Sequence, residues 1–174
     1  MAGYLFDTSM LIALTNARSP FHQPANDFLA SLAGEDLQFV SSVSLGELQS
    51  GVDSIFAIKG QRPVTAQQTL KQAEAYDLLV VDRHVALSYG RLKAAMVAKF
   101  LPKASQRRSH LEDWIDNATG ARLAVNENDL WICAQAHERD ICVVACDHDF
   151  ERVQAAEPTL KLKLVTSYDL PDAV

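Results

Sequence analysis

Five acidic side chains lie at the ends of predicted strands or in the first turns of predicted helices, where they could do chemistry together. They are Asp7, Glu47, Asp129, Asp147 and Asp149. Two unit charges ~4 Å apart repel by ~1 kcal/mol in water and ~4 kcal/mol at an effective dielectric of ~20, so gathered carboxylates need a cation. An all-oxygen ligand set suits Mg²⁺ or Mn²⁺ rather than zinc or copper. Such a site could activate a water for in-line cleavage of a phosphodiester bond.

The elements that must position these acids alternate between strands and helices. Short apolar runs predict strands at 4–6, 37–40, 78–81, 141–145 and 162–165. Apolar residues at helical spacing predict helices at 10–14, 28–32, 43–56, 65–76, 85–96 and 129–139. This alternation predicts an α/β fold of three layers, α/β/α, around a central and mainly parallel sheet. Sites form at the carboxyl ends of the strands in such sheets, which is where the acids lie.

Each acid also has a local explanation that involves no chemistry. Asp7 could cap a helix or begin a turn, and residues 147–149 could form an ordinary turn. Ser44 with Glu47 matches a capping box. Asn126 could cap a helix whose first turn carries Asp129. The sequence favours a shared site because all of these positions project from the same edge of a doubly wound sheet.

The composition is that of an ordinary globular protein. The chain has 174 residues, of which 48% are hydrophobic and 22% are charged, with a net charge of −6. These values exclude a disordered tail, a fibre and a disulfide-dense mini-protein, and the length predicts one domain over 1–174. No apolar run approaches the roughly 20 residues that span a bilayer. The three cysteines lack a paired CxxC pattern, so we expect a cytoplasmic protein with no signal peptide and no membrane contact.

Basic residues are concentrated in one stretch. Between residues 83 and 111 there are seven Lys and Arg residues and no Asp or Glu. The stretch is either a solvated helix face followed by a basic loop, or a platform for a polyanion or an acidic partner. The second interpretation assigns RNA or partner binding to four of them, Lys99, Lys103, Arg107 and Arg108.

The segments that hold the acids resemble, in order, the four acidic motifs of PIN-domain ribonucleases, and most closely those of the VapC toxins of bacterial toxin–antitoxin pairs. The four segments are LFDTSMLI at 5–12, SVSLGEL at 42–48, NDLWICA at 128–134 and DHDFERV at 147–153. Asp82, Val85 and the YGRL segment at 89–92 also resemble the region between the second and third motifs. The resemblance covers most of the chain and implies a PIN-like fold.

Carried over position by position, the resemblance implies a catalytic and metal-binding role for four acids. Asp7 is the first metal ligand, Glu47 the second acid, Asp129 the third acid and main metal partner of Asp7, and Asp147 the fourth. Asp149 is an auxiliary ligand.

The same resemblance implies supporting residues, a cofactor and partners. Thr8 or Ser9 supplies a hydroxyl that steadies the first motif, and Asn128 supplies an orienting amide. The family implies a Mg²⁺-dependent endoribonuclease, with Mn²⁺ as a substitute. It also implies an RNA substrate, a homodimer, and a small antitoxin that inserts into the active-site groove.

Three features depart from the family pattern. Ala145 stands two residues before Asp147, where the family usually has Ser or Thr, so one hydrogen bond is absent or supplied elsewhere. Trp131 is bulkier than the usual aliphatic residue. The stretch at 100–126 is longer than the usual connection, and we expect an irregular, partly basic insertion there.

The sequence leaves two other functions open. A PIN-like module with weak catalysis could act only by binding RNA or an antitoxin. A haloacid-dehalogenase-like phosphatase also uses an Asp after the first strand, but it needs a second Asp two residues later, where this sequence has Ser9.

Overall fold

The computed structural model describes residues 1–101 and 110–167. Five strands of the described residues form one sheet: β1 (Gly3–Phe6), β2 (Leu37–Ser41), β3 (Asp77–Leu79), β4 (Cys142–Ala145) and β5 (Lys161–Leu164). Their order is β3-β2-β1-β4-β5, and every neighbouring pair is parallel. The mainly parallel sheet predicted from the apolar runs is therefore confirmed.

Seven α-helices connect or follow these strands in the described residues. They are α1 (Thr8–Thr15), α2 (His22–Ser31), α3 (Ser42–Lys59), α4 (Val64–Ala73), α5 (Arg83–Phe100), α6 (Glu127–Glu138) and α7 (Asp149–Ala156). Apolar spacing did not predict α7, and it overestimated β3, which ends two residues before the predicted strand does. None of the described helices has the length and apolar composition needed to cross a bilayer.

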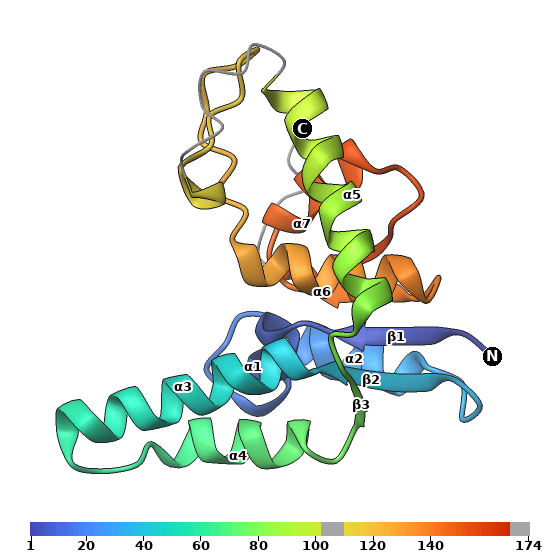
Figure 1. Cartoon of the computed structure of the whole chain (residues 1–174). Helices are drawn as coiled ribbons and strands as arrows, with labels where there is room; N and C mark the ends of the chain where they lie inside the picture. Colours follow the sequence, from blue (N-terminus) through green and yellow to red (C-terminus); the bar gives the residue numbers. More distant parts are fainter. Residues whose placement is uncertain (102–109, 168–174) are drawn as a thin grey trace.

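The sheet separates two apolar cores. In Figure 1, α5, α6 and α7 lie on one side of the sheet and α1 to α4 on the other. Successive strand residues point to opposite faces. Leu5 and Val143 accordingly join the core under α5 to α7, whereas Phe6 and Val144 join the core under α1, α2 and α4. Strands buried on both faces read as continuous apolar runs, which is why the sequence revealed this three-layer α/β/α fold.

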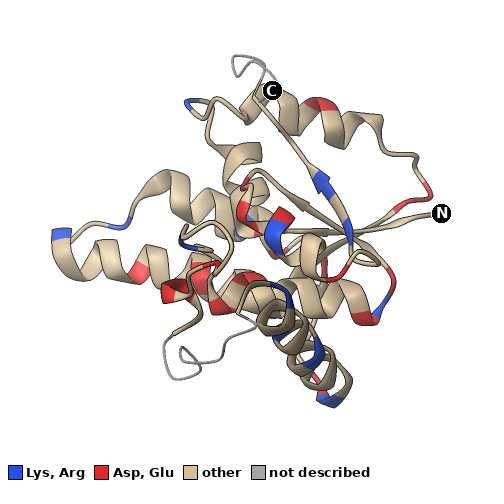
Figure 2. Cartoon of the chain, turned by 90° about the horizontal axis from the view of Figure 1, so that it is seen from above, with Lys and Arg blue, Asp and Glu red and all other residues tan. Residues whose placement is uncertain are grey.

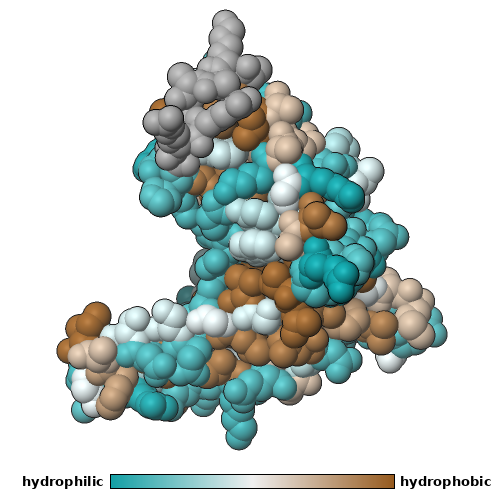
Figure 3. All heavy atoms as spheres, in the orientation of Figure 1, coloured by the Kyte–Doolittle hydropathy of each residue, from teal (hydrophilic) through white to brown (hydrophobic). Residues whose placement is uncertain are grey.

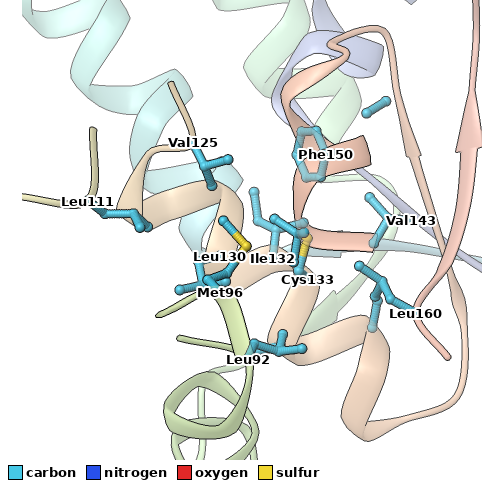
Figure 4. Close-up of a cluster of buried hydrophobic side chains, with 14 of the residues drawn as sticks. Leu92, Met96, Leu111, Val125, Leu130, Ile132, Cys133, Val143, Phe150 and Leu160 are labelled. Carbon is cyan, nitrogen blue, oxygen red and sulfur yellow. The ribbon is translucent and has the colours of Figure 1, made fainter. Parts of the chain in front are cut away.

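The core under α5 to α7 also fixes the position of the later site residues. Leu92 and Met96 of α5 pack against Leu130 of α6, next to Phe150 of α7 (Figure 4). Helix α6 begins at the carboxyl edge of the sheet, and this packing holds its first turn in place.

The expected insertion at 100–126 is partly an ordered extension of this core. Leu111, Trp114, Leu123 and Val125 are all buried in it, and residues 111–113 form a short 3₁₀ helix. The segment turns back through an antiparallel bridge between Ile115 and Arg122. Residues 110–126 thus have little regular secondary structure beyond this helix and bridge, but their apolar side chains pack in the core.

Candidate active site

Asp7 follows β1 directly and caps α1. Its Oδ2 accepts hydrogen bonds from the Ser9 backbone N at 2.8 Å and from the Ser9 Oγ at 2.6 Å, which confirms the predicted cap. Asp7 is only 4% exposed. The pKa of this carboxyl is raised to about 6, mainly because the group is buried, and the charge of Glu47 contributes to the rise. The hydrogen bonds from Ser9 oppose the shift.

Glu47 does not take part in the capping box predicted from the sequence. Helix α3 starts directly at the end of β2, and Ser41 is its N-cap, with its Oγ accepting from the Val43 backbone N at 2.9 Å. Ser44 lies inside the helix, buried, and its hydroxyl has no hydrogen-bond partner. The local explanation for Glu47 is therefore wrong, and the side chain is available for other contacts.

Two other motif residues hold Glu47 in place. Thr8 Oγ1 donates to Glu47 Oε2 at 2.5 Å, and Asn128 Nδ2 donates to Glu47 Oε1 at 2.8 Å. These contacts connect the first turns of α1 and α6 to α3, so three segments far apart in the sequence meet at one carboxylate.

Asp129 is a helix cap and a member of the acidic group at the same time. Asn126 Oδ1 accepts from the Asp129 N at 2.8 Å, which confirms the predicted Asn126 cap. Asp129 Oδ2 also accepts from the Asn126 N at 3.1 Å, so the two residues form a capping box that was not predicted from the sequence. Burial raises the pKa of Asp129 to about 7, and the nearby charges of Asp7, Asp147 and Glu47 add to the shift. The other three predicted acids thus lie close enough to Asp129 to raise its pKa.

The two acids after β4 have different surroundings. Asp147 is exposed, and its Oδ1 accepts from the Asp149 backbone N at 3.0 Å, as in the predicted turn. Asp149 forms an ion pair with Arg152, whose guanidinium also donates to the Leu123 carbonyl oxygen. Asp149 therefore has a protein cation, Arg152, as its partner. Arg152 also connects the insertion at 100–126 to α7.

Ser9 connects the first and fourth motifs. Its hydroxyl donates to Asp7 and accepts from the Cys146 backbone N at 3.0 Å. Ala145 has no side-chain group that could form a hydrogen bond at the end of β4. The hydroxyl of Ser9, in α1, supplies a hydrogen bond there instead. Sequence reasoning assigned Ser9 only to the first motif, because its contact with residue 146 depends on β1 and β4 being neighbours.

The donor chemistry of this group fits a hard divalent cation. Its carboxylate oxygens are the ligands that Mg²⁺ and Mn²⁺ prefer, and raised pKa values at Asp7 and Asp129 are what unneutralised, buried carboxyls should show. Among residues 1–101 and 110–167, no group of three His, Cys, Asp or Glu side chains is close enough together to hold a metal ion as it stands.

A groove leads from Glu47 along α3. It has a volume of about 600 Å³ and is lined mainly by Ser and Gly residues of that helix, together with Asn128 of α6. Figure 3 shows the hollow between the projecting α3–α4 pair and the rest of the molecule. Small side chains on α3 thus give access to the acidic group from one side.

A second acidic residue of α6 is neutralised locally. Glu127 accepts hydrogen bonds from Lys93 Nζ at 2.5 Å and from the Tyr89 hydroxyl, and Tyr89 stacks on Trp131 with ring centroids 3.9 Å apart. Burial raises the pKa of Glu127, but Lys93 and Tyr89 outweigh it and the net shift is downward. The unusual Trp131 is the one sequence signal of this network, because Glu127 lies 34 residues from Lys93.

The basic stretch is used in more than one way. Figure 2 shows Lys and Arg along α5, but Lys93 among them is already paired with Glu127. Lys99 is exposed in the last turn of α5, with its Nζ 5.9 Å from the centre of the Phe100 ring. Lys103, Arg107 and Arg108 lie outside the described residues.

Comparisons with known proteins identify the fold independently. A family model described as the PIN domain matches residues 4–156. The structure of VapBC2 from Rickettsia felis, bound to a DNA fragment from its promoter, includes a chain with 19% identity and a TM-score of 0.62; the match covers 93% of this chain and 98% of that one. No curated protein matches the sequence.

Two structures from Mycobacterium tuberculosis are also similar. One is VapBC-5, with 22% identity and a TM-score of 0.57 over 95% of this chain and 99% of that one. The other is VapC20, described as a toxin that cleaves the sarcin–ricin loop, with 18% identity and a TM-score of 0.52 over 85% of this chain and 92% of that one. At these identities the matches establish a shared fold.

Proposed function

The chain belongs to the PIN domain family, and on that premise we propose that it is a Mg²⁺-dependent endoribonuclease that acts as the toxin of a VapBC-like toxin–antitoxin pair. The observation that carries the proposal is the convergence of Asp7, Glu47, Asp129 and Asp147 on one edge of the sheet. Together with burial, which is the largest cause, the charges of the other three acids raise the pKa of Asp129 to about 7. Among the described residues, no Lys or Arg side chain forms an ion pair with these four carboxylates, and a divalent ion would stabilise such an arrangement.

In this proposal Asp7 and Asp129 would hold the ion, with Glu47 and Asp147 beside it. A bound Mg²⁺, or Mn²⁺ in its place, would lower the pKa of the attacking water and offset charge on the scissile phosphate. Thr8 and Asn128 orient the two oxygens of Glu47. Ser9 keeps the Asp7 carboxylate facing the end of β4, so its role is to position rather than to react.

The substrate and partners follow from the relatives. VapC20 is described as a toxin that cleaves the sarcin–ricin loop, and VapBC-5 as a member of a family of toxin–antitoxin systems, which supports an RNA substrate and a small antitoxin partner for this chain. The groove along α3 gives either one a path to Glu47. We further propose a homodimer of one domain over 1–174, active in the cytoplasm, where the free thiols of Cys133, Cys142 and Cys146 are stable.

The family assignment removes the phosphatase alternative and leaves the module that binds without cleaving. The four acids and their supporting hydrogen bonds favour the enzyme, because a pure binding module gains nothing from burying unneutralised carboxyls.

The test is cleavage of a structured RNA by the purified protein with Mg²⁺ or Mn²⁺ and then with a chelator. We expect cleavage only with the metal, and its loss in Asp7→Asn and Asp129→Asn. Glu127→Gln is the matched control, since it removes a neighbouring carboxylate that Lys93 already neutralises. Cleavage that persists with the chelator, or in both Asn variants, would overturn the mechanism.

The basic stretch has a separate test. Replacing Lys99, Lys103, Arg107 and Arg108 with Gln should weaken RNA or antitoxin binding and reduce its dependence on salt. Unchanged affinity for both across a salt series would show that the stretch is only a solvated surface.

A further inference from the structure

A second hollow, distinct from the groove along α3, adjoins the acidic group. It has a volume of about 400 Å³ and is lined by Ile12, Phe21, Ser19, Cys146 and His148. Ser9 and Asp147 of the candidate active site complete its wall. A ligand in this hollow would therefore lie next to whatever the acids bind.

The hollow presents apolar side chains, which is unusual beside four carboxylates. Ile12 is 42% exposed although it lies in α1, whose other apolar residues are buried. Phe21 is half-buried and packs against the core under α1 and α2, so its ring is held from behind. Together they offer a flat aromatic ring and an aliphatic side chain to a planar ligand.

The turn that carries Phe21 is fixed by hydrogen bonds. The Phe21 backbone N donates to Ser19 Oγ at 3.2 Å, and the His22 N donates to the Ser19 carbonyl oxygen at 3.0 Å. His22 Nδ1 also lies 2.8 Å from the Ala13 carbonyl oxygen, which anchors the start of α2 to α1. A preformed ring of this kind binds without the entropic cost of ordering a loop.

The charges select which part of a nucleotide can enter. Where no cation offsets its charge, Asp147 at the rim disfavours a phosphate inside the hollow itself, whereas a nucleobase is neutral and its faces stack well on an aromatic ring. The Ser19 hydroxyl and the His148 imidazole supply polar groups that can read the edge of a base. The volume suits a small planar ligand in a pocket with few polar groups.

We propose that this hollow binds an unpaired nucleobase of the RNA substrate next to the scissile phosphate, with Phe21 as the stacking surface and Ile12 as its opposite wall. The proposal rests on the function proposed above and adds to it a base-specific subsite. Sequence preference then comes from the turn between α1 and α2, whereas the acids hold the ion that acts on the phosphate.

A binding experiment that needs no catalysis tests the pocket directly. The isoleucine δ1 methyl groups are labelled with ¹³C, and adenosine, guanosine, cytidine and uridine are titrated separately to millimolar concentration in the presence of a chelator. We expect at least one nucleoside to shift the Ile12 methyl through its ring current. Ile58, which is 82% exposed at the end of α3, provides the control methyl and should not move.

Two variants separate stacking from packing. Phe21→Ala should abolish the Ile12 shift, and Phe21→Leu, which keeps the apolar volume that supports the fold, should weaken it at least severalfold. The proposal is overturned if no nucleoside moves the Ile12 methyl, or if both variants respond as the unaltered protein does. A shift produced by N-acetylarginine amide but by no nucleoside would also overturn it and would indicate a pocket for a protein side chain.

Cleavage of a random-sequence RNA then relates the pocket to function. We expect the unaltered protein to prefer one base at a single position beside the cut, and Phe21→Leu to reduce that preference about tenfold while leaving other positions unchanged. Phe56→Ala, at an exposed aromatic residue far along α3, is the control. If no RNA is cleaved, the proposed function fails while the nucleoside titration still decides the pocket; an unaltered preference in Phe21→Leu overturns the pocket alone.

Discussion

Two carboxylates in the first turn of α6 lie two residues apart and meet opposite surroundings. Glu127 contacts Lys93 and Tyr89, and its pKa is lowered. Asp129 faces Asp7, Asp147 and Glu47 and has a pKa of about 7, with burial as the largest cause. The same helix end therefore carries one neutralised acid and one that is not, so the helix dipole cannot explain the difference.

The start of α7 shows a similar contrast in ion pairing. Asp149 pairs with Arg152, whereas Asp147 accepts a backbone hydrogen bond from residue 149 and has no ion pair among the described residues. Burial and the charge of Asp147 nevertheless raise the pKa of Asp149. The paired acids join segments of the fold: Glu127 joins α5 to α6, and Asp149 with Arg152 joins α7 to the insertion. The proposed function is assigned to the acids that have no ion pair among the described residues.

The largest expected effect comes from removing an acid that has no protein cation. Asp129→Asn keeps the capping hydrogen bonds, since its amide oxygen still accepts from Asn126, but it should lower the rate of RNA cleavage by at least about 100-fold. Glu127→Gln should lower it by only a few fold. Similar losses in both variants, measured under single-turnover conditions, would remove the distinction between the two acids.

The second effect is on stability and depends on pH. The pKa values of about 6 at Asp7 and about 7 at Asp129 lie above the unfolded value of 3.8, so the folded protein holds more protons than the unfolded chain over this window. Without metal, the free energy of unfolding should therefore fall as pH rises from about 4 to 7, by at most ~3 kcal/mol for each acid.

Urea unfolding at pH 5 and pH 8 with a chelator measures this effect. Asp129→Asn should be more stable than the unaltered protein at pH 8 and should lose part of that advantage at pH 5. Comparing the two proteins cancels the contribution of other titrating groups. If Asp129→Asn is less stable than the unaltered protein at both pH values, the inferred cost of burying the ionised Asp129 carboxylate is contradicted.

A smaller effect is expected from the neutralised pair on α7. Arg152→Ala removes the hydrogen bond to the Leu123 carbonyl oxygen and leaves Asp149 unpaired, so we expect a loss of about 1–2 kcal/mol in stability. Hydrogen exchange should become faster in residues 111–125. Arg122→Ala breaks the exposed pair with Asp113 and is the control, with a loss below about 0.5 kcal/mol. Equal losses in the two variants would mean that Arg152 does not hold the insertion.

The smallest effect concerns the position of Asp7. Ser9→Ala removes the side-chain hydrogen bond that lowers the pKa of Asp7, so the acidic limb of the cleavage rate against pH should move to higher pH by a fraction of a unit. Ser9→Thr keeps the hydroxyl and should restore the original limb. A reduced rate with no movement of the limb would indicate a purely structural role for Ser9.

The fold was predictable because its signals are local and regular. Leu5 and Phe6 are adjacent and buried on opposite faces, so β1 reads as an apolar run, and parallel order then places Asp7 and Asp147 at one edge. The Asn126 cap was also predictable, because its hydrogen bond to Asp129 spans three residues.

The errors and omissions have physical reasons of their own. Ser44 does not cap α3 as the sequence predicts. Strand β2 leads into α3 with no intervening loop, so Ser41 both ends the strand and caps the helix. The pair of Asp149 with Arg152 has a visible i,i+3 spacing, but the spacing cannot tell that Arg152 also reaches Leu123. The partners of Glu127 come from α5 and required the folded structure.

The central claim, that the acids without a protein cation form the ion-binding site, is tested most directly by calorimetric titration with Mn²⁺ at pH 8, where Asp7 and Asp129 are ionised. We predict saturable binding to the unaltered protein, equal binding to Glu127→Gln, and loss of binding in Asp129→Asn. Binding that survives in Asp129→Asn, or that disappears in Glu127→Gln, would contradict the account.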